Sequence, residues 1–180
     1  MDVYAQNGIK SVPVFRTGRL TLRTFQSADG PTAVDALNHW NVTQWLTRVP
    51  FPYALTDFEW FLSDMCNDPN DMIWAIERDQ QMIGAISVSD ELGYWLDPKC
   101  HGQGLMSEAA HCVCTWHFGQ SHDTLVSGYH VGNGPSSAVL AKVGFVDTHI
   151  NSNVETARGD HVDIQRMELT RTRWESLQNA

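Results

Sequence analysis

The most informative segment of the sequence is GYWLDPKCHGQGLMSEAA, residues 93–110. A strand-like run ends at Leu96, an Asp-Pro pair turns the chain, and Gly102 and Gly104 stand directly before a helical segment. Glycines at such a junction let consecutive backbone N–H groups converge, and the helix N-terminus adds a partial positive charge. The stretch therefore predicts an anion site of the phosphate-binding kind. Its alternative is a tight turn with no ligand, because a lone Gly-x-Gly is weakly specific.

Two common phosphate-binding patterns do not fit this stretch. Gly104 is followed by Leu105 and Met106, where a P-loop needs Lys and then Ser or Thr. The third glycine of a dinucleotide-binding pattern would fall at Ser107. A nucleotide-binding domain of either type is therefore a minor alternative.

The runs on both sides of the loop predict how the sheet is built. Three strand-like runs precede it and form an antiparallel meander, at residues 72–77, 82–88 and 91–96. A helix is expected over 107–118 with Gly119 as its stop, followed by a strand over 124–131. Because strand, helix and strand in succession require a crossover, the strands on either side of that helix should be parallel.

The remaining segments complete one α/β (α+β) domain over 1–180, with 1–16 as a loosely held lead-in. The sheet should be mixed and mostly antiparallel, with helices on its faces. Thr56 and Glu59 predict a capping box ahead of a helix that ends before Pro69. Further strands are expected at 19–25, 145–150 and 162–169, and further helices near 31–40 and over 136–143, the last ending at Gly144.

Composition narrows the function classes. The 180 residues are 42% hydrophobic and carry a net charge of −9, without a basic stripe, so a nucleic-acid partner is not expected. No apolar run reaches the roughly 18 residues that a membrane span needs. Four cysteines and an N-terminus without the apolar core of a secretory signal predict a cytoplasmic protein. Cys112 and Cys114 are two residues apart on one helix and cannot converge, so no metal is expected.

A second constellation lies about 30 residues beyond the glycine loop. Asn133-x-x-Ser136-x-x-Val139-Leu140-x-Lys142-x-Gly144-Phe145, taken with Lys99-x-x-Gly102-x-Gly104, resembles the GNAT superfamily of acetyl-CoA-dependent N-acyltransferases. The branch it resembles contains the ribosomal-protein N-terminal acetyltransferases of RimJ/RimL type. Thr17-Gly18-Arg19-Leu20-Thr21-Leu22-Arg23, Val49-Pro50-Phe51-Pro52-Tyr53 and Gly93-Tyr94-Trp95-Leu96 also match, so the resemblance covers residues 16 to 175. It implies the GNAT fold, in which the two parallel strands splay apart.

The resemblance also implies a cofactor site. Acetyl-CoA would lie in the splay, with Leu96 offering backbone pairing to the pantetheine arm. The pyrophosphate would bind the backbone amides of His101, Gly102, Gln103, Gly104, Leu105 and Met106. The other cofactor-binding residues implied are Lys99, Asn133, Ser136 and Lys142. Lys99 replaces the usual Arg or Gln, which changes a bidentate fork into a point charge, and Asn133 has capping of the next turn as its alternative.

Amine acetylation needs an uncharged amine and a proton for the departing thiolate. An alkylammonium has a pKa near 10, so a base must remove its proton. Glu91 is the expected general base, with Asp90, His130 or a water chain as alternatives. Its structural interpretation is a solvated carboxylate at the end of a strand. Ser136 would donate to the CoA sulfur or would cap its helix. Leu140 stands where many family members carry a Tyr, so the general acid stays open, and Cys100 is not expected to act as a nucleophile.

The function that follows is an N-acetyltransferase that moves acetyl from acetyl-CoA directly to a primary amine. The acceptor is a small-molecule amine or a protein N-terminus, and the acidic net charge favours a cationic one. The first two helices, residues 45–53 and residues 151–163 should recognise it, with Trp40, Trp45, Phe51, Tyr53 and Tyr94 as candidate pocket walls. The alternative from another class is a non-catalytic acyl-CoA-binding sensor or scaffold. Monomer and homodimer both stay open.

Overall fold

The computed structural model describes residues 9–121 and 123–179. Its centre is an eight-stranded sheet in the order β1-β2-β3-β4-β5-β6-β8-β7. The strands are β1 (Phe15–Arg16), β2 (Thr21–Arg23), β3 (Met72–Arg78), β4 (Gln81–Val88), β5 (Leu92–Leu96), β6 (Leu125–His130), β7 (Val146–Glu155) and β8 (His161–Leu169). The helices are α1 (Gly30–Leu37), α2 (Trp40–Thr43), α3 (Leu55–Trp60), α4 (Leu105–Gln120), α5 (Gly134–Val143) and α6 (Arg171–Gln178).

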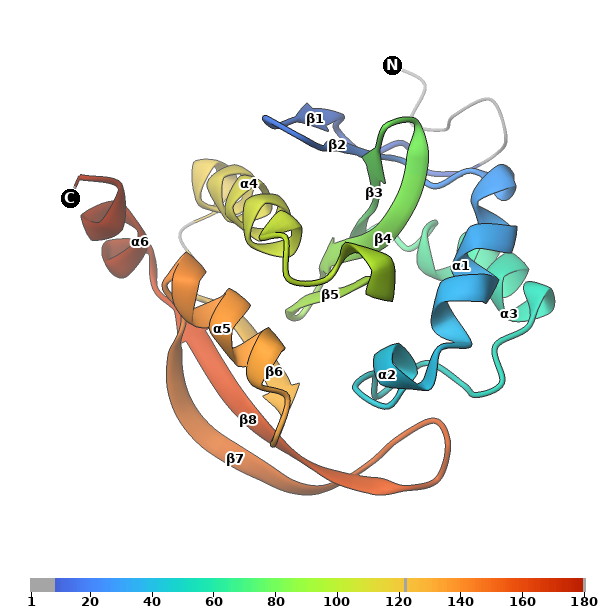
Figure 1. The fold of residues 1–180 in the computed structure, drawn as a ribbon. Coiled ribbons are helices and arrows are strands. Elements are labelled where there is room, and N and C mark those ends of the chain that lie inside the picture. The colour runs from blue at the N-terminus through green and yellow to red at the C-terminus, as the bar shows by residue number, and fades with distance from the viewer. Residues whose placement is uncertain (1–8, 122, 180) are drawn as a thin grey trace.

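The helices lie on both faces of the sheet (Figure 1). Alternation along β3 sends Trp74 and Ile76 into the core under α4, and Ile73 and Ala75 into the core under α1 and α3. Each face of the central strands is therefore buried, which explains why 72–77 and 82–88 are nearly continuous apolar runs. No helix among the described residues is long and apolar enough to cross a membrane.

The parallel pair sits where the sheet opens. Strands β5 and β6 are parallel and share a single register pair, Leu92 with Ser127, where Ser127 Oγ also donates to the Leu92 carbonyl at 2.8 Å. Beyond that pair, β5 stays bonded to β4 and β6 to β8, and the two strands diverge. The expected mixed, mostly antiparallel sheet with one splayed parallel pair is confirmed. Beyond the Leu92–Ser127 pair, the facing backbone edges of β5 and β6 are not paired with each other.

Several expected element boundaries are wrong. Helix α3 begins at Leu55, because Asp57 Oδ2 accepts the Ala54 N–H at 2.7 Å and does the capping that Thr56 and Glu59 were expected to do. A π-helical turn follows at Phe61–Met65. Helix α4 begins two residues early, at Leu105, and continues through Gly119 to Gln120. A glycine in right-handed conformation does not end a helix, although it lowers its stability.

The ends of the chain also differ from expectation. Residues 1–8 of the lead-in lie outside the described residues, but Ile9 and Val12 are buried in the two cores and Phe15–Arg16 pairs with β2. The described part of the lead-in is therefore packed against the domain rather than loosely held. Helix α6 was not predicted, and it buries Trp174 against the Phe118 ring at 5.7 Å. Its apolar content is too low for the periodicity of a buried face to stand out.

Candidate active site

A cavity of about 1030 Å³ occupies the splay and is lined from both faces of the sheet. On one face its walls are the loop after β5 and the first turns of α4 and α5. On the other face they are α3 and the segment after α2, residues 45–50. Strands β5, β6 and β8 contribute Tyr94, His130 and Arg166, and the bend before β5 contributes Glu91. A volume of this size suits a ligand as large as a cofactor together with part of a second molecule.

The loop after β5 has the form of an anion site. Gly102 and Gly104 both have a φ of +72°, and Gly104 is the N-cap of α4. This left-handed backbone favours glycine, and Gly102, Gly104, Leu105 and Met106 line the cavity. The Asp97 side chain holds the turn by accepting the Lys99 N–H at 2.8 Å. The structure thus brings the expected amide donors to the end of the splay.

Leu96 and His101, two residues expected to bind the cofactor through their backbones, contact each other in the structure. The His101 ring nitrogen Nε2 lies 2.9 Å from the Leu96 carbonyl, so that carbonyl already has a partner. A pantetheine arm that pairs with this carbonyl would have to use its second lone pair or displace the His101 ring.

Within the described part of the chain, the residues that line the cavity do not include Lys99, Gln103 or Lys142. Lys99 is 74% exposed and its Nζ lies 3.7 Å from Asp35 Oδ2. Gln103 turns outward to Arg78, and Lys142 lies exposed on the last turn of α5. The geometry of the loop and of the helix determines where these side chains point, and residue spacing alone does not predict it.

Two hydroxyl groups meet on the cofactor-loop face of the splay. Tyr94 Oη lies 2.9 Å from Ser136 Oγ and 3.2 Å from the Ser136 carbonyl oxygen. Burial raises the pKa of Tyr94 to about 12, against the opposing effect of the Ser136 hydrogen bond. The side chain of Asn133 caps α5 by accepting the Ser136 N–H at 3.2 Å. Capping therefore falls to Asn133, and the Ser136 hydroxyl is left to face Tyr94.

Tyr94 was expected only as a pocket wall. Tyr94 alternates with Trp95 along β5, so it shares the face of Leu92 and Leu96, which belongs to the core shared with α4 and α5. What the spacing does not reveal is the crossing of α5 over that face. The Tyr94–Ser136 pair is a product of the tertiary structure.

Glu91 and Arg166 form an ion pair on the opposite side of the cavity. Glu91 lies in the bend before β5, and its Oε2 is 2.6 Å from Arg166 Nη2 on β8. Arg166 crosses β6 at Gly128, where an added Cβ would lie only 3.1 Å from its Nη1. Glycine at 128 thus leaves room for the guanidinium. Arg166 was not identified from sequence, since its partner is 75 positions away along the chain and no local pattern links them.

His130 is the other titratable group on this side. It is buried at the end of β6, with Nε2 3.0 Å from Thr47 Oγ1 and the Trp45 ring at 6.3 Å. Burial, followed by the charge of Arg158, lowers the pKa of His130 below its ordinary 6.5. A neutral imidazole at pH 7 is able to accept a proton. The structure leaves Asp90 exposed in the same bend as Glu91.

Comparison with known proteins decides the family. Residues 19–146 match the family described as acetyltransferase (GNAT) domain. The chain belongs to the GNAT acetyltransferase family. No curated protein sequence matches it.

Solved structures of acetyltransferases share the fold. The RimL ribosomal L7/L12 alpha-N-protein acetyltransferase in complex with coenzyme A is similar at TM-score 0.74 and 21% identity, over 89% of this chain and 98% of that one. A spermidine N-acetyltransferase from Vibrio cholerae in complex with CoA and spermine gives 0.74 and 18%, over 88% and 99%. The microcin C7 self-immunity acetyltransferase MccE in complex with acetyl-CoA and AMP gives 0.74 and 17%, over 86% and 93%. At these identities the likeness shows the fold, and it confirms the expected architecture.

The tip of the β7–β8 hairpin reaches below α2 in Figure 1, and Ala157 at this tip lines the acetyltransferase cavity. The Ala157 N–H donates to the Thr47 carbonyl at 2.7 Å. Arg158 Nη1 donates to the carbonyls of Thr43 at 2.9 Å and Leu46 at 2.7 Å. The two segments expected to recognise the acceptor, 45–53 and 151–163, are thus bonded to each other at this tip.

The aromatic residues divide into two groups. Trp45, Tyr53 and Tyr94 line the cavity, and Trp60 joins them from α3. Trp40 and Phe51 are 52% and 42% exposed and pack on each other at 5.3 Å outside it. They are therefore not walls of the pocket in this structure.

The thiols of this acetyltransferase are free, and they are poorly suited to nucleophilic attack. Burial raises the pKa of Cys114 to about 12 and also raises the pKa of Cys100, the cysteine in the cofactor loop. A thiolate is the reactive form of cysteine. Among the described residues, no group of three His, Cys, Asp or Glu side chains is arranged to hold a metal.

Proposed function

We propose that this GNAT acetyltransferase transfers acetyl from acetyl-CoA directly to a primary amine. The observation that carries the proposal is the splay cavity. It has a glycine-loop anion site at one end, the Tyr94–Ser136 hydroxyl pair on one face, and His130 and the Glu91–Arg166 pair on the other. The candidate proton donor lies on one face and the candidate proton acceptors on the other, and amine acetylation needs a group of each kind.

Acetyl-CoA fits the residues that are present. The loop amides lie at the N-terminus of a sixteen-residue helix, α4, where a pyrophosphate is stabilised by backbone donors and by the helix dipole. An added Cβ at Gly102 would meet open space, so the backbone there is accessible to a phosphate. When bound, acetyl-CoA supplies the acetyl group as an activated thioester.

On the acceptor face, proton acceptance falls to His130 or Glu91. His130 is neutral at pH 7 because its pKa is lowered, and its Nε2 is held near the Thr47 hydroxyl. Arg166 binds one oxygen of the Glu91 carboxylate, so an incoming ammonium has to share that carboxylate with a guanidinium. We therefore rank His130 beside Glu91 as the base and place Asp90 below both.

On the cofactor face, Ser136 is the donor to the departing sulfur. Its Oγ–H is free to point into the cavity when the Tyr94 hydroxyl donates to Ser136 Oγ. Tyr94 then supports Ser136 as the proton donor, a role for which the chain has no tyrosine at position 140. Because a tyrosine of raised pKa keeps its proton, it acts as a lasting hydrogen-bond donor and not as an anion.

The acceptor class is inferred from the cavity and from the proteins of similar fold. One of those acts on a ribosomal protein N-terminus and another on spermidine. The acceptor half of the cavity combines Trp45, Tyr53 and Trp60 with the carboxylates of Asp57 and Asp71. Aromatic faces and carboxylates together favour a cationic amine. We place the protein in the cytoplasm, where its four free thiols stay reduced.

Thermal melting with acetyl-CoA, CoA, ATP and NAD side by side tests the proposal, followed by thiol release with polyamines and N-terminal peptides. Both CoA species should raise Tm, because a ligand that binds the native state stabilises it. Thiol release with one amine class then names the acceptor. Glu91→Gln and His130→Gln, assayed on that acceptor, identify the base as the variant that loses turnover while CoA still binds. A Tm shift without turnover on any amine would instead favour the non-catalytic sensor, and no shift with CoA would contradict the cofactor site.

A further inference from the structure

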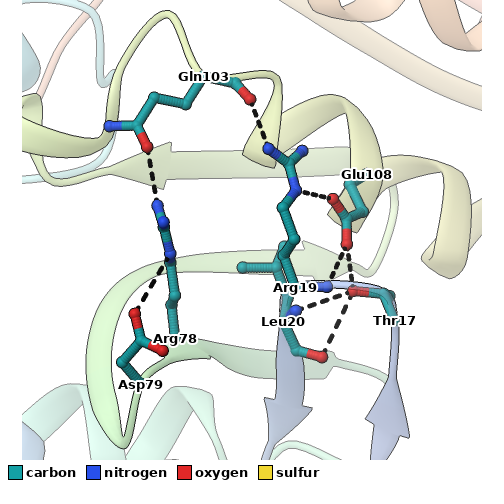
Figure 2. Close-up of polar contacts among 7 residues, drawn as sticks. All are labelled: Thr17, Arg19, Leu20, Arg78, Asp79, Gln103 and Glu108. Atoms are coloured by element: carbon teal, nitrogen blue, oxygen red, sulfur yellow. Dashed lines mark hydrogen bonds and ion pairs between the residues drawn. The ribbon is translucent and has the colours of Figure 1, made fainter.

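A network of polar contacts supports the glycine loop from outside the cavity (Figure 2). It starts at the turn between β1 and β2. Thr17 Oγ1 and the Arg19 N–H donate to Glu108 Oε1 at 2.6 and 2.9 Å, and Arg19 Nε donates to Glu108 Oε2 at 2.7 Å. Glu108 lies in the first turn of α4. The turn is therefore bonded to the helix that carries the anion site.

The Glu108 carboxylate keeps Arg19 in one orientation. Burial alone would raise the pKa of Glu108, but the hydrogen bonds from Thr17 and Arg19 outweigh it and the net pKa is lowered. Glu108 is thus ionised at neutral pH and available to the guanidinium. A planar guanidinium with several donors is able to bind a second acceptor at the same time.

That second acceptor is the loop backbone. Arg19 Nη1 donates to the Gln103 carbonyl at 2.9 Å, and this carbonyl belongs to the same peptide unit as the Gly104 N–H. In a planar trans peptide the N–H points opposite to the C=O. The Gly104 N–H therefore points away from Arg19, and a charged donor on the carbonyl polarises the peptide and strengthens that N–H as a donor.

Arg78 holds the same residue through its side chain. Figure 2 shows Arg78 reaching from the end of β3 to Gln103, with Nη1 2.7 Å from Gln103 Oε1. Gln103 Nε2 in turn donates to the Lys99 carbonyl at 3.0 Å. Gln103 is thus tied by its backbone and its side chain between two glycines, the residues with the most conformational freedom to lose.

We propose that Arg19 and Arg78 are positioning residues for the phosphates of acetyl-CoA. They hold the peptide between Gln103 and Gly104 in its binding orientation before the cofactor arrives. Neither residue acts on the acetyl group or the amine. The inference rests on the proposed acetyl-CoA site. It predicts that substitution of either arginine lowers kcat/KM only for acetyl donors that carry the pyrophosphate.

The test compares acetyl-CoA with acetyl-pantetheine, which has the thioester and the arm but lacks the pyrophosphate and the nucleotide. Arg19→Gln should lower kcat/KM for acetyl-CoA about tenfold with kcat unchanged. Its kcat/KM for acetyl-pantetheine should equal that of the wild type. Arg78→Gln should show the same donor dependence with a smaller loss, about threefold, because it acts on the side chain of Gln103.

Two further variants separate positioning from charge. Arg16→Gln removes the same charge from the exposed neighbouring strand β1 without touching the loop, and it should behave as the wild type. Arg19→Lys keeps the charge but loses the fork that joins Glu108 to the Gln103 carbonyl, so it should lose nearly as much as Arg19→Gln. If Arg16→Gln lost as much as Arg19→Gln, or Arg19→Lys lost nothing, simple attraction would explain the effect and positioning would be wrong.

The outcomes also separate this inference from the proposed function. Equal losses with both donors, or no loss with either, would overturn the positioning role. If the wild-type protein binds CoA but acetylates no amine, the proposed function fails. In that case calorimetric affinities of the same variants for CoA and pantetheine test the positioning role with the same expected pattern. A wild-type protein that binds no CoA would overturn both.

Discussion

The position of the Tyr94 hydroxyl proton determines where the Ser136 hydroxyl can donate its own proton. The Tyr94 hydroxyl has a single proton and two acceptors within reach, the Ser136 carbonyl at 3.2 Å and Ser136 Oγ at 2.9 Å. If that proton goes to Oγ, the Ser136 proton is directed elsewhere, and the cavity is the open direction. Tyr94 thereby sets the direction in which Ser136 donates.

Substitution at these two positions tests the coupling. Ser136→Ala should lower kcat about a hundredfold and Tyr94→Phe about tenfold, both with little change in KM for acetyl-CoA. In the Ser136→Ala background, Tyr94→Phe should cost nothing more, since Tyr94 acts through Ser136. Steady-state kinetics on the four proteins measure this cycle. Independent, multiplicative losses would show that the two hydroxyls act separately.

The buried imidazole of His130 predicts a pH dependence of stability. Its pKa is lower in the folded protein than the ordinary 6.5, so the unfolded chain binds more protons between the two values. The contribution is fully present above about pH 6.5 and is lost as the pH falls through the folded pKa. Urea unfolding at pH 7.5, 6 and 5 should therefore show a smaller acid loss for His130→Gln than for the wild type.

Exposed His161 provides the matched control for that experiment. His161→Gln should follow the wild type at every pH. An acid loss in His130→Gln as large as that of the wild type would mean that other groups, and not His130, carry the pH dependence.

At the scale of elements, the junction between β5 and α4 distinguishes two glycines that look alike in sequence. Gly104 has a φ of +72° at the helix N-cap, and Gly119 lies inside the last turn of α4 with open space around it. An L-residue in left-handed backbone costs about 1–2 kcal/mol, whereas alanine in a helix is better than glycine by roughly 0.8–1 kcal/mol. The same substitution should have opposite effects at the two sites.

Gly104→Ala should therefore lower the free energy of unfolding by about 1 kcal/mol and weaken CoA binding. Gly119→Ala should raise the free energy of unfolding by up to about 1 kcal/mol and leave CoA binding unchanged. Urea unfolding and calorimetric titration with CoA measure both quantities. A stabilised Gly104→Ala that still binds CoA normally would contradict the loop's role as an anion site.

At the scale of the whole molecule, the acceptor end of the cavity is assembled from segments more than 100 residues apart. Arg158 from the β7–β8 tip binds the carbonyls of Thr43 and Leu46 next to α2, and its guanidinium lies 5.6 Å from the Trp40 ring. The Arg158 side chain is only 8% exposed. These contacts hold the hairpin against the helical half of the domain, and they place Thr47 beside His130.

Arg158→Ala should destabilise the fold by about 2–3 kcal/mol, because it leaves two half-buried carbonyls without their charged donor. It should also raise KM for the amine while KM for acetyl-CoA stays near the wild-type value. Arg16→Ala, on an exposed strand, serves as the control. Equal increases in both KM values would show that the hairpin tip supports the entire cavity and not the acceptor end alone.

The pattern of local sequence was sufficient to predict most of the fold and the position of the glycine loop. Short apolar runs, the Gly-x-Gly before a helix and the crossover rule all act within a few tens of residues. They led to the meander, to α4 and α5, and to the parallel pair. The Gly144 helix end was also correct, since a left-handed C-cap is a local property.

Tertiary packing decided the partners of the chemical groups. Tyr94 meets Ser136, Arg166 meets Glu91, Arg19 meets Gln103 and Arg158 meets Leu46 across sequence separations of 42, 75, 84 and 112 residues. Such contacts depend on how helices cross the sheet and where long side chains end, and no periodicity along the chain encodes either. The sequence alone therefore indicated a candidate binding loop and a reaction class. The relative positions of the proposed proton donor, base and supporting arginines depend on how the two halves of the sheet pack in the tertiary structure.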